Sequence, residues 1–184
     1  NYGIYNNGIV NISNVEISAT SYGIYNYNTK GKVEMSNGTI ISSKEKGVYL
    51  STNSIFNITG GTVKGTTGIY SYGGKVVIGT KGGEVSQNNP TIVGEQYGIQ
   101  SSNVNNNETI KYYDGIVSGE KNAFYGRINE IEEQKQINIS KQDQYIVATL
   151  IDEEVIEDGI AQITSSGGSV DLDNDSITKN ANQE

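Results

Sequence analysis

The chain has 184 residues and contains no cysteine, histidine or tryptophan, one proline and one methionine. The absence of cysteine excludes disulfides, thiolate metal sites and cysteine nucleophiles. The absence of histidine removes the imidazole that serves as a general base and metal ligand, so Ser-His-Asp hydrolysis and most zinc chemistry are excluded. We therefore expect no cofactor.

Long apolar runs are also absent, and positive charge is scarce. No run of about 18 apolar residues occurs, so we expect no membrane span. The first residues have neither a basic start nor an apolar signal core, and residue 1 is Asn, so we expect a processed chain or a piece of a longer protein. With 13 basic against 21 acidic side chains, we expect no nucleic-acid partner.

The negative charge is concentrated at one end of the chain. Residues 1–127 carry 10 basic and 8 acidic side chains, whereas residues 128–184 carry 3 basic and 13 acidic side chains. This shift predicts a boundary near residue 128. We expect repeats in 1–127, terminal strands or a cap in 128–164, and a polar, flexible tail or linker in 165–184.

A short motif recurs through residues 1–127. Tyr2-Gly3-Ile4-Tyr5-Asn6 returns as Tyr22-Gly23-Ile24-Tyr25-Asn26, and looser copies follow around Gly47, Gly68, Gly98 and Ala123. The lead positions are 20, 24, 21, 30 and 25 residues apart. Two further short runs rich in β-branched residues follow the first four lead segments, at 9–12 and 15–17, 33–35 and 39–41, 55–58 and 62–63, and 76–78 and 91–93.

Three short strands in each 20 to 30 residues are typical of a parallel β-helix, in which each coil contributes one strand to each of three sheets. We predict an all-β, right-handed parallel β-helix (a solenoid) of about six coils with an irregular acidic C-terminal segment. A leucine-rich repeat would need a leucine framework, and the chain has only Leu50, Leu150 and Leu172. A propeller blade would need about 40 residues and antiparallel hairpins.

Alternation of side chains along a strand predicts three columns in the lead segments. The position after the lead glycine points inward: Ile4, Ile24, Val48, Ile69, Ile99 and Phe124. The next position points outward: Tyr5, Tyr25, Tyr49, Tyr70, Gln100 and Tyr125. The third position lies at an inner corner, where amide and hydroxyl groups can bond the turn backbone: Asn6, Asn26, Leu50, Ser71, Ser101 and Gly126.

These repeats carry a resemblance. The runs "YGIYN", "NISNVEIS", "VEMSNGTIIS", "NITGGTVKG" and "YYDGIVSG" resemble the β-helical repeat regions of large bacterial cell-surface and adhesin-like proteins, which have a pectate-lyase-like (pectin lyase-like) fold. The resemblance covers about residues 1–140. It implies secretion, an extracellular location at the cell surface, and a longer parent chain with more coils.

The same repeat pattern serves adhesins, stalks and polysaccharide-cleaving enzymes. A hydrolase needs two carboxylates about 5 to 9.5 Å apart, but Glu16 and Glu34 lie at different distances from their lead positions and are not expected to stack. A lyase needs a cationic base and usually calcium held by aspartates, whereas Arg127 is the only arginine and Asp114 the first aspartate. We therefore predict a non-enzymatic structural or adhesive segment with no catalytic residues. The alternative is a polysaccharide lyase or hydrolase domain, and a fibre-forming trimer also fits the repeats.

The tyrosine column is the candidate ligand-binding site. Outward Tyr5, Tyr25, Tyr49 and Tyr70, one coil apart, would present aromatic faces in a line, and sugar rings and protein partners stack on such faces. The partner would be a glycan or a host or cell-surface protein. In the alternative interpretation the rings only pack on one another along the ladder.

The two ends of the repeat region give two further expectations. The strand-like runs after residue 128 are expected to cover one open end of the core, while the other end begins within the repeat pattern and favours end-to-end self-association. In the tail, Asp171, Asp173 and Asp175 place oxygen ligands at alternating positions, as at the start of a calcium loop. The sixth position is Ser176 rather than Gly and the twelfth is Asn182 rather than Glu, so an acidic tail without metal is the simpler interpretation.

Overall fold

The computed structural model describes residues 1–86, 88–102, 109–153, 161–165 and 168–172. The chain forms two compact units, Asn1–Asp152 and Glu153–Glu184. The first unit is a parallel β-solenoid, and all regular structure in the described residues is β-strand. The same residues contain no helix long and apolar enough to cross a membrane. In the second unit, β18 (Ala161–Ser165) and β19 (Gly168–Leu172) form an antiparallel hairpin.

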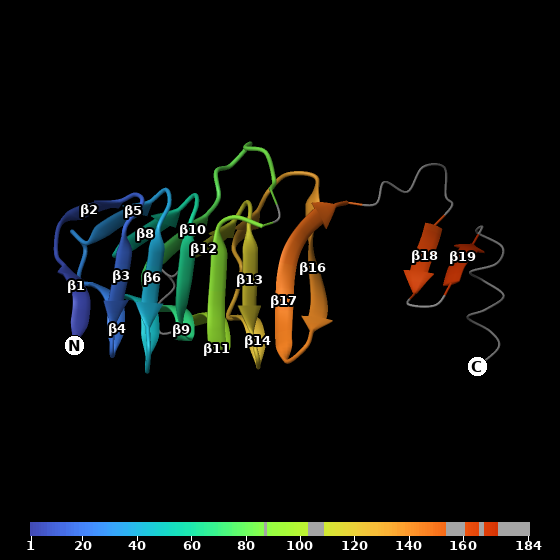
Figure 1. Ribbon diagram of the computed structural model, residues 1–184. Coiled ribbons are helices and arrows are strands. Elements are labelled where there is room, and N and C mark those ends of the chain that lie inside the picture. The colour runs from blue at the N-terminus through green and yellow to red at the C-terminus, as the bar shows by residue number, and fades with distance from the viewer. Residues whose placement is uncertain (87, 103–108, 154–160, 166–167, 173–184) are drawn as a thin grey trace. The chain divides into compact units, whose positions relative to one another are not determined.

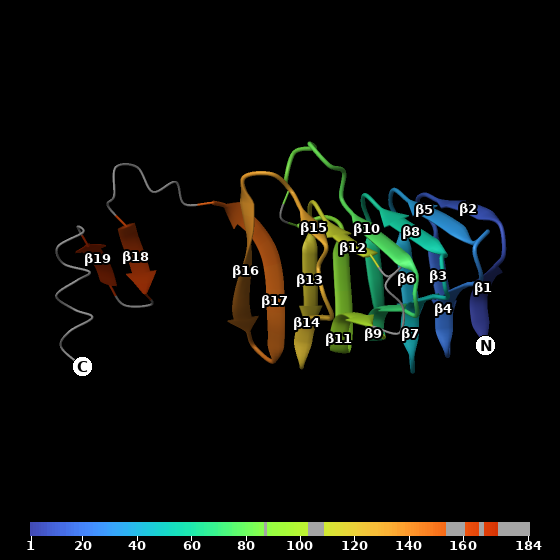
Figure 2. The ribbon, with the colours of Figure 1, turned by 180° about the vertical axis from the view of Figure 1, so that it is seen from behind.

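Three columns of parallel strands form the solenoid (Figure 1). The lead column consists of β1 (Tyr2–Asn6), β4 (Tyr22–Asn26), β7 (Lys46–Leu50), the second parts of β9 (Thr62–Ser71) and β11 (Thr91–Ser101), and β14 (Asn122–Tyr125). The second column, seen from behind in Figure 2, consists of β2 (Ile9–Ile12), β5 (Lys32–Met35), β8 (Ile55–Ile58), β10 (Lys75–Ile78), β12 (Thr109–Tyr112) and β15 (Glu130–Ile131). The third column consists of β3 (Glu16–Ala19), β6 (Thr39–Ser42), the first parts of β9 and β11, and β13 (Ile116–Gly119).

The predicted all-β solenoid is therefore confirmed, with about five complete turns rather than six. The six lead segments are all present and in register, as Ile4, Ile24 and Val48 show. The sixth coil lacks a parallel third strand, because the chain after β15 turns into an antiparallel hairpin of β16 (Lys135–Gln142) and β17 (Tyr145–Asp152). This is why counting lead segments overestimates the number of turns by one.

The lead glycines are required because the third strand of the same coil and the lead strand of the next coil both approach the backbone at this position. A Cβ built on Gly47 would lie 2.6 Å from the carbonyl oxygen of Gly68 and 2.6 Å from a methyl carbon of Val63. Gly3, Gly23, Gly68 and Gly98 meet the same pair of obstacles, a backbone carbonyl of the next coil and a β-branched side chain of the third column. The repeated glycine therefore reflects a corner with no room for a side chain.

The core lies inside the coils and is built from the inward positions of all three columns. Ile24, Val48, Ile69 and Ile99 are fully buried, as the sequence predicts, while Ile4 and Phe124 at the two ends are partly buried and pack against the core. The other columns contribute further buried side chains, among them Val33, Phe56, Ile58, Val76, Ile40, Val63 and Ile92. Burial of about 25 cal/mol per Å² of apolar surface is the main stabilising term for such short strands.

The inner corner column forms the predicted polar ladder. The Asn6 side-chain amide donates to the Asn26 Oδ1 over 2.9 Å, and the Asn26 amide donates to the carbonyl oxygens of Gly31 and Ile55 at 3.1 and 2.8 Å. Two coils further on, the Ser71 hydroxyl donates to the Gly74 carbonyl and accepts from the Gly74 N–H. The two asparagines thus tie the turns of successive coils together, whereas Ser71 bonds only its own turn.

The β16–β17 hairpin covers the end of the core beyond β13. β17 pairs antiparallel with β13, and its residues Val147, Ala148 and Leu150 are buried. The buried Tyr112 hydroxyl is 3.1 Å from the Ala148 carbonyl oxygen, which ties the hairpin to the last coils. At the opposite end β1, β2 and β3 are edge strands, and Ile9 is 73% exposed there.

Candidate functional site

The predicted tyrosine column is a continuous ring stack on the outer face of the lead column. The ring centroids of Tyr5 and Tyr25 are 5.4 Å apart with planes at 4°, and those of Tyr25 and Tyr49 are 4.5 Å apart at 7°. Tyr49 and Tyr70 continue the stack at 5.5 Å and 24°. The in-register pairing of β1, β4, β7 and β9 brings all four together, because it places equivalent residues one strand spacing apart.

A second row of outward side chains lies beside this stack. Each of its residues comes three positions before the stacked tyrosine of the same strand. Tyr2 and Tyr22 stack at 5.6 Å, and Tyr22 contacts Tyr25 edge to face at 5.4 Å. Lys46 follows in the same row, with its Nζ 5.2 Å from the Tyr70 ring centroid. A cation at that distance is attracted by the ring face. The aromatic face is therefore two residues wide and is bounded by a lysine.

Two hydroxyl groups of this face, those of Tyr22 and Tyr49, stay neutral at ordinary pH. Burial, and a hydrogen bond with Glu45, raise the pKa of Tyr22 to about 12. Burial raises the pKa of Tyr49 further, helped by the neighbouring Tyr25. Neutral hydroxyls can both donate and accept hydrogen bonds.

The stacking changes what the column can offer to a ligand. Tyr25 and Tyr49 have a ring on each side, so their faces are covered and only their edges and hydroxyls are presented outward. The expected line of open aromatic faces is not formed, and the rings pack along the ladder as in the alternative interpretation. The reason is that the coil spacing of about 4.8 Å is close to the stacking distance of aromatic rings.

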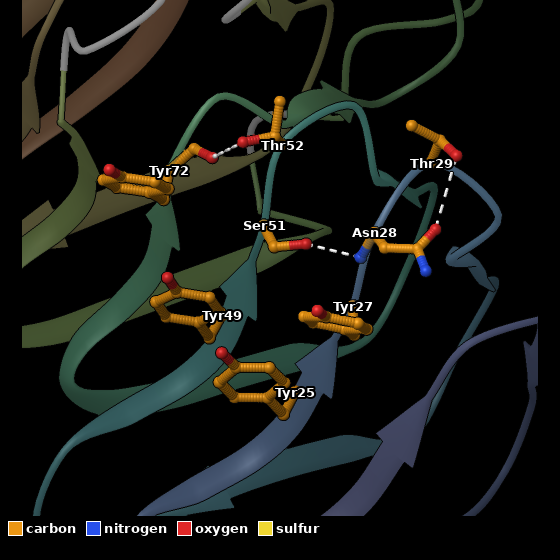
Figure 3. Close-up of a pocket in the computed structure, with 8 residues that line it drawn as sticks. All are labelled: Tyr25, Tyr27, Asn28, Thr29, Tyr49, Ser51, Thr52 and Tyr72. Atoms are coloured by element: carbon orange, nitrogen blue, oxygen red, sulfur yellow. Dashed lines mark hydrogen bonds between the residues drawn. The ribbon is translucent and has the colours of Figure 1, made fainter.

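An open recess of about 490 Å³ lies next to this stack (Figure 3). Tyr25, Tyr49, Tyr27, Asn28, Thr29, Ser51, Thr52 and Tyr72 line it. The rings of Tyr27 and Tyr72 stand on either side of Ser51, and those of Tyr25 and Tyr49 lie at the foot of the recess (Figure 3). Tyr27 and Tyr72 are 42% and 39% exposed, so part of each side chain is open to solvent.

Sequence reasoning missed Tyr27 and Tyr72. Both follow the inner corner residue of their coil, in the segments Tyr25-Asn26-Tyr27 and Tyr70-Ser71-Tyr72. The repeated Tyr-x-Tyr spacing is the signal that points to them. This signal is hard to recognise in the sequence, because the equivalent residue of the coil between them is Ser51. The position therefore does not form an unbroken tyrosine column.

Two other recesses contain acidic side chains. One of about 310 Å³ is lined by residues that include Glu34, and one of about 480 Å³ by residues that include Glu95, Lys64 and Tyr145. Each of these recesses has a single carboxylate in its lining, and that of the tyrosine recess has none. Paired carboxylates, which glycoside hydrolysis uses, do not meet in any of the three.

A cluster of charges lies on the outer face of the second column. Glu130 Oε1 is 2.8 Å from the Lys81 Nζ, and Glu130 Oε2 is 2.6 Å from the Lys111 Nζ. Hydrogen bonds from Lys111, Lys81 and Tyr113 lower the pKa of Glu130 to about 2. The cluster links β12 and β15 with the segment after β10, which is a structural role.

The described residues contain no group of three or more acidic side chains placed to hold a metal ion. Of the three aspartates that suggested a calcium loop, Asp173 and Asp175 lie outside the described residues.

Comparisons with protein-family models, with curated proteins and with solved structures find no match for the chain. The structure itself defines the class of molecule: a parallel β-solenoid with a tyrosine-rich outer face.

Proposed function

We propose that this chain is a non-enzymatic structural and adhesive repeat segment of a secreted bacterial surface protein. One observation carries the proposal: eight tyrosines gather on one outer face of the first four coils, namely Tyr2, Tyr5, Tyr22, Tyr25, Tyr27, Tyr49, Tyr70 and Tyr72. A surface cluster of aromatic rings that carry hydroxyl groups suits contact with sugars and with protein partners. The solenoid would hold this face on a rigid rod.

The rod-like architecture supports the structural part of the proposal. Each coil contacts mainly its neighbours, so a solenoid extends by adding coils and spaces a binding surface from whatever anchors it. The pectate-lyase-like repeat motifs support an extracellular, cell-surface location. The alternative, a polysaccharide lyase or hydrolase domain, would need a groove with converging catalytic groups, and none of the three recesses has two carboxylates.

The adhesive function is tested by the double variant Tyr25→Ser, Tyr49→Ser. We expect it to lose binding to immobilised glycans and to cultured epithelial cells, because it removes the centre of the aromatic face. The matched control is Tyr97→Ser, Tyr125→Ser, which removes another contacting tyrosine pair from later coils, Tyr125 from the tyrosine column and Tyr97 from the row beside it. Equal binding by the wild type and the Tyr25/Tyr49 variant would remove the aromatic face from the function.

End-to-end association is a further part of the proposal, favoured by the edge strands β1, β2 and β3. Ile9 and Val15 are exposed at that end, and edge strands present unpaired backbone groups to another chain. We expect sedimentation velocity to show concentration-dependent association that Ile9→Lys weakens. A single monomeric species at all concentrations, with a sharp unfolding transition in dilute solution, would contradict it.

A further inference from the structure

We propose that the recess between Tyr27 and Tyr72 is a clamp for one neutral hexopyranose ring of a glycan. This proposal rests on the adhesive function above and names its ligand class. The clamp differs from the tyrosine column, because its two rings are separated rather than stacked (Figure 3).

The spacing of the two rings follows from the register of the coils. The N–H groups of Tyr27, Ser51 and Tyr72 donate to the carbonyls of Asn6, Asn26 and Leu50, so the three residues occupy one position in three successive coils. Tyr27 and Tyr72 are thus two strand spacings apart, about 10 Å. A ring midway between them would be about 5 Å from each, within the stacking range of about 4.5–7 Å.

Ser51 is what keeps the space open. In the neighbouring column every coil from the first to the fourth carries a tyrosine, and the rings fill the column themselves, as Tyr25 and Tyr49 do at 4.5 Å. At the clamp position the middle coil has a small side chain instead. Tyr5 of the coil before and Tyr25 of the same coil both stack on Tyr27, at 5.8 and 6.3 Å. Tyr27 is nevertheless 42% exposed, and a ligand would contact this open part of its ring.

Hydrogen-bonding groups surround the gap. The Ser51 hydroxyl oxygen accepts from the Asn28 N–H, which leaves its own proton to donate. The Asn28 side-chain oxygen Oδ1 accepts from the Thr29 hydroxyl and from the Lys30 N–H, which leaves the side-chain NH₂ as a donor. A pyranose offers the matching pattern, with C–H groups on its faces for the tyrosine rings and hydroxyls around its rim.

The lining also selects for charge. All eight lining residues are Tyr, Asn, Ser or Thr, so no charged side chain faces the gap. A uronate, a sulfated sugar or a phosphate would lose its hydration here without gaining a counter-charge. The clamp is therefore expected to prefer neutral sugars over the acidic polymers that pectate-degrading enzymes handle.

The experiment is calorimetric titration of the full chain with maltohexaose, cellohexaose, mannohexaose and hexagalacturonate. At least one of the three neutral probes should bind, and hexagalacturonate should bind about tenfold more weakly or not at all. Tyr27→Ser and Tyr72→Ser should each weaken binding about tenfold by removing one stacking wall. Tyr125→Ser is the control and should bind as the wild type does.

Ser51→Tyr is the decisive variant, because it fills the gap with an in-register ring and leaves every tyrosine in place. It should fold, since tyrosine ladders are already present one column away, and this is checked by thermal unfolding. It should abolish binding of the neutral probe, while Ser51→Ala, which keeps the gap open, should stay within about threefold of the wild type.

The outcomes separate the clamp from the broader proposal. If Ser51→Tyr folds and still binds the neutral probe, or if hexagalacturonate binds as tightly, the clamp is wrong. Should the wild type bind cells in a Tyr25- and Tyr49-dependent way but no neutral hexasaccharide, the adhesive face stands, the clamp is overturned and a protein partner is indicated. Loss of binding to everything tested would overturn both.

Discussion

Two columns of the lead strands are adjacent in sequence and opposite in environment. Tyr25 and Tyr49 point outward and stack on each other, whereas Asn26, one residue later, is fully buried and bonds three backbone or side-chain groups. The outer column accepts Gln100 in its fifth coil without disturbing the register. In the inner column, a different residue needs its own hydrogen-bond partner. The Ser71 hydroxyl, for example, bonds its own turn at Gly74. The inner side chains thus depend on specific buried hydrogen-bond partners, whereas the outer side chains depend on stacking with their neighbours.

The strongest test of this difference is Gly47→Ala at the corner where no side chain fits. The new methyl group would lie 2.6 Å from the Gly68 carbonyl oxygen, a backbone atom that cannot move alone. We expect the free energy of unfolding to fall by about 3 kcal/mol. Urea unfolding measures it, with Gly8→Ala as the control, because a Cβ there meets nothing closer than 3.9 Å. Equal stability of the two variants would contradict the steric explanation.

Asn26→Leu tests the inner column, because the next coil carries Leu50 at the same position. The variant removes the bonds that the buried Asn26 side chain makes to the Gly31 and Ile55 carbonyls, and the bond that it accepts from the Asn6 amide. We expect a loss of about 2 kcal/mol in the free energy of unfolding. Asn7→Leu, at an exposed neighbouring position, is the control. A neutral effect of Asn26→Leu would show that apolar packing, rather than hydrogen bonding, holds this corner.

Tyr49→Ser is expected to have a smaller effect, of about 1 kcal/mol, because the ring is only half buried although it stacks on both Tyr25 and Tyr70. The free energy of unfolding is measured by chemical denaturation and compared with that of the control Tyr72→Ser, whose ring lies outside the stack. The difference gives the contribution of stacking. If Tyr49→Ser cost as much as Asn26→Leu, the contrast between the outer and inner columns would fail.

The smallest effect concerns the charged outer face of the second column. Because the pKa of Glu130 is lowered to about 2, its ion pairs add stability above its unfolded pKa of about 4.3, and this is lost as the pH falls toward 2. Glu130→Gln should therefore lose less stability than the wild type between about pH 4.5 and 2. Melting temperatures across that range measure this. Parallel curves for the two proteins would show that the cluster does not contribute.

Much of the fold was predictable because each coil repeats the same alternation of inward and outward side chains. The alternation of Ile24, Tyr25 and Asn26 predicted which side chains point inward, and the structure confirms it. The end of the solenoid was harder to predict, since β16 and β17 follow no repeat. The antiparallel pairing of β17 with β13 depends on the exposed edge of the last coil.

The binding surface was only partly predictable. The column of Tyr5, Tyr25, Tyr49 and Tyr70 follows from the repeat, but the direction of its ring faces does not. The Tyr27 and Tyr72 pair was not recognised, because Ser51 interrupts its column. A residue such as Ser51 that interrupts a column of tyrosines can be recognised only after the register of the coils is known.

By itself, the sequence determined the class of fold, the inward and outward columns and the place of the lead glycines, because strand alternation and turn chemistry are local properties that recur in every coil. Only the tertiary structure decided that the tyrosine faces cover one another and that a gap opens over Ser51. These features depend on distances between coils, which are set by the hydrogen-bonded spacing of the strands and not by neighbours along the chain.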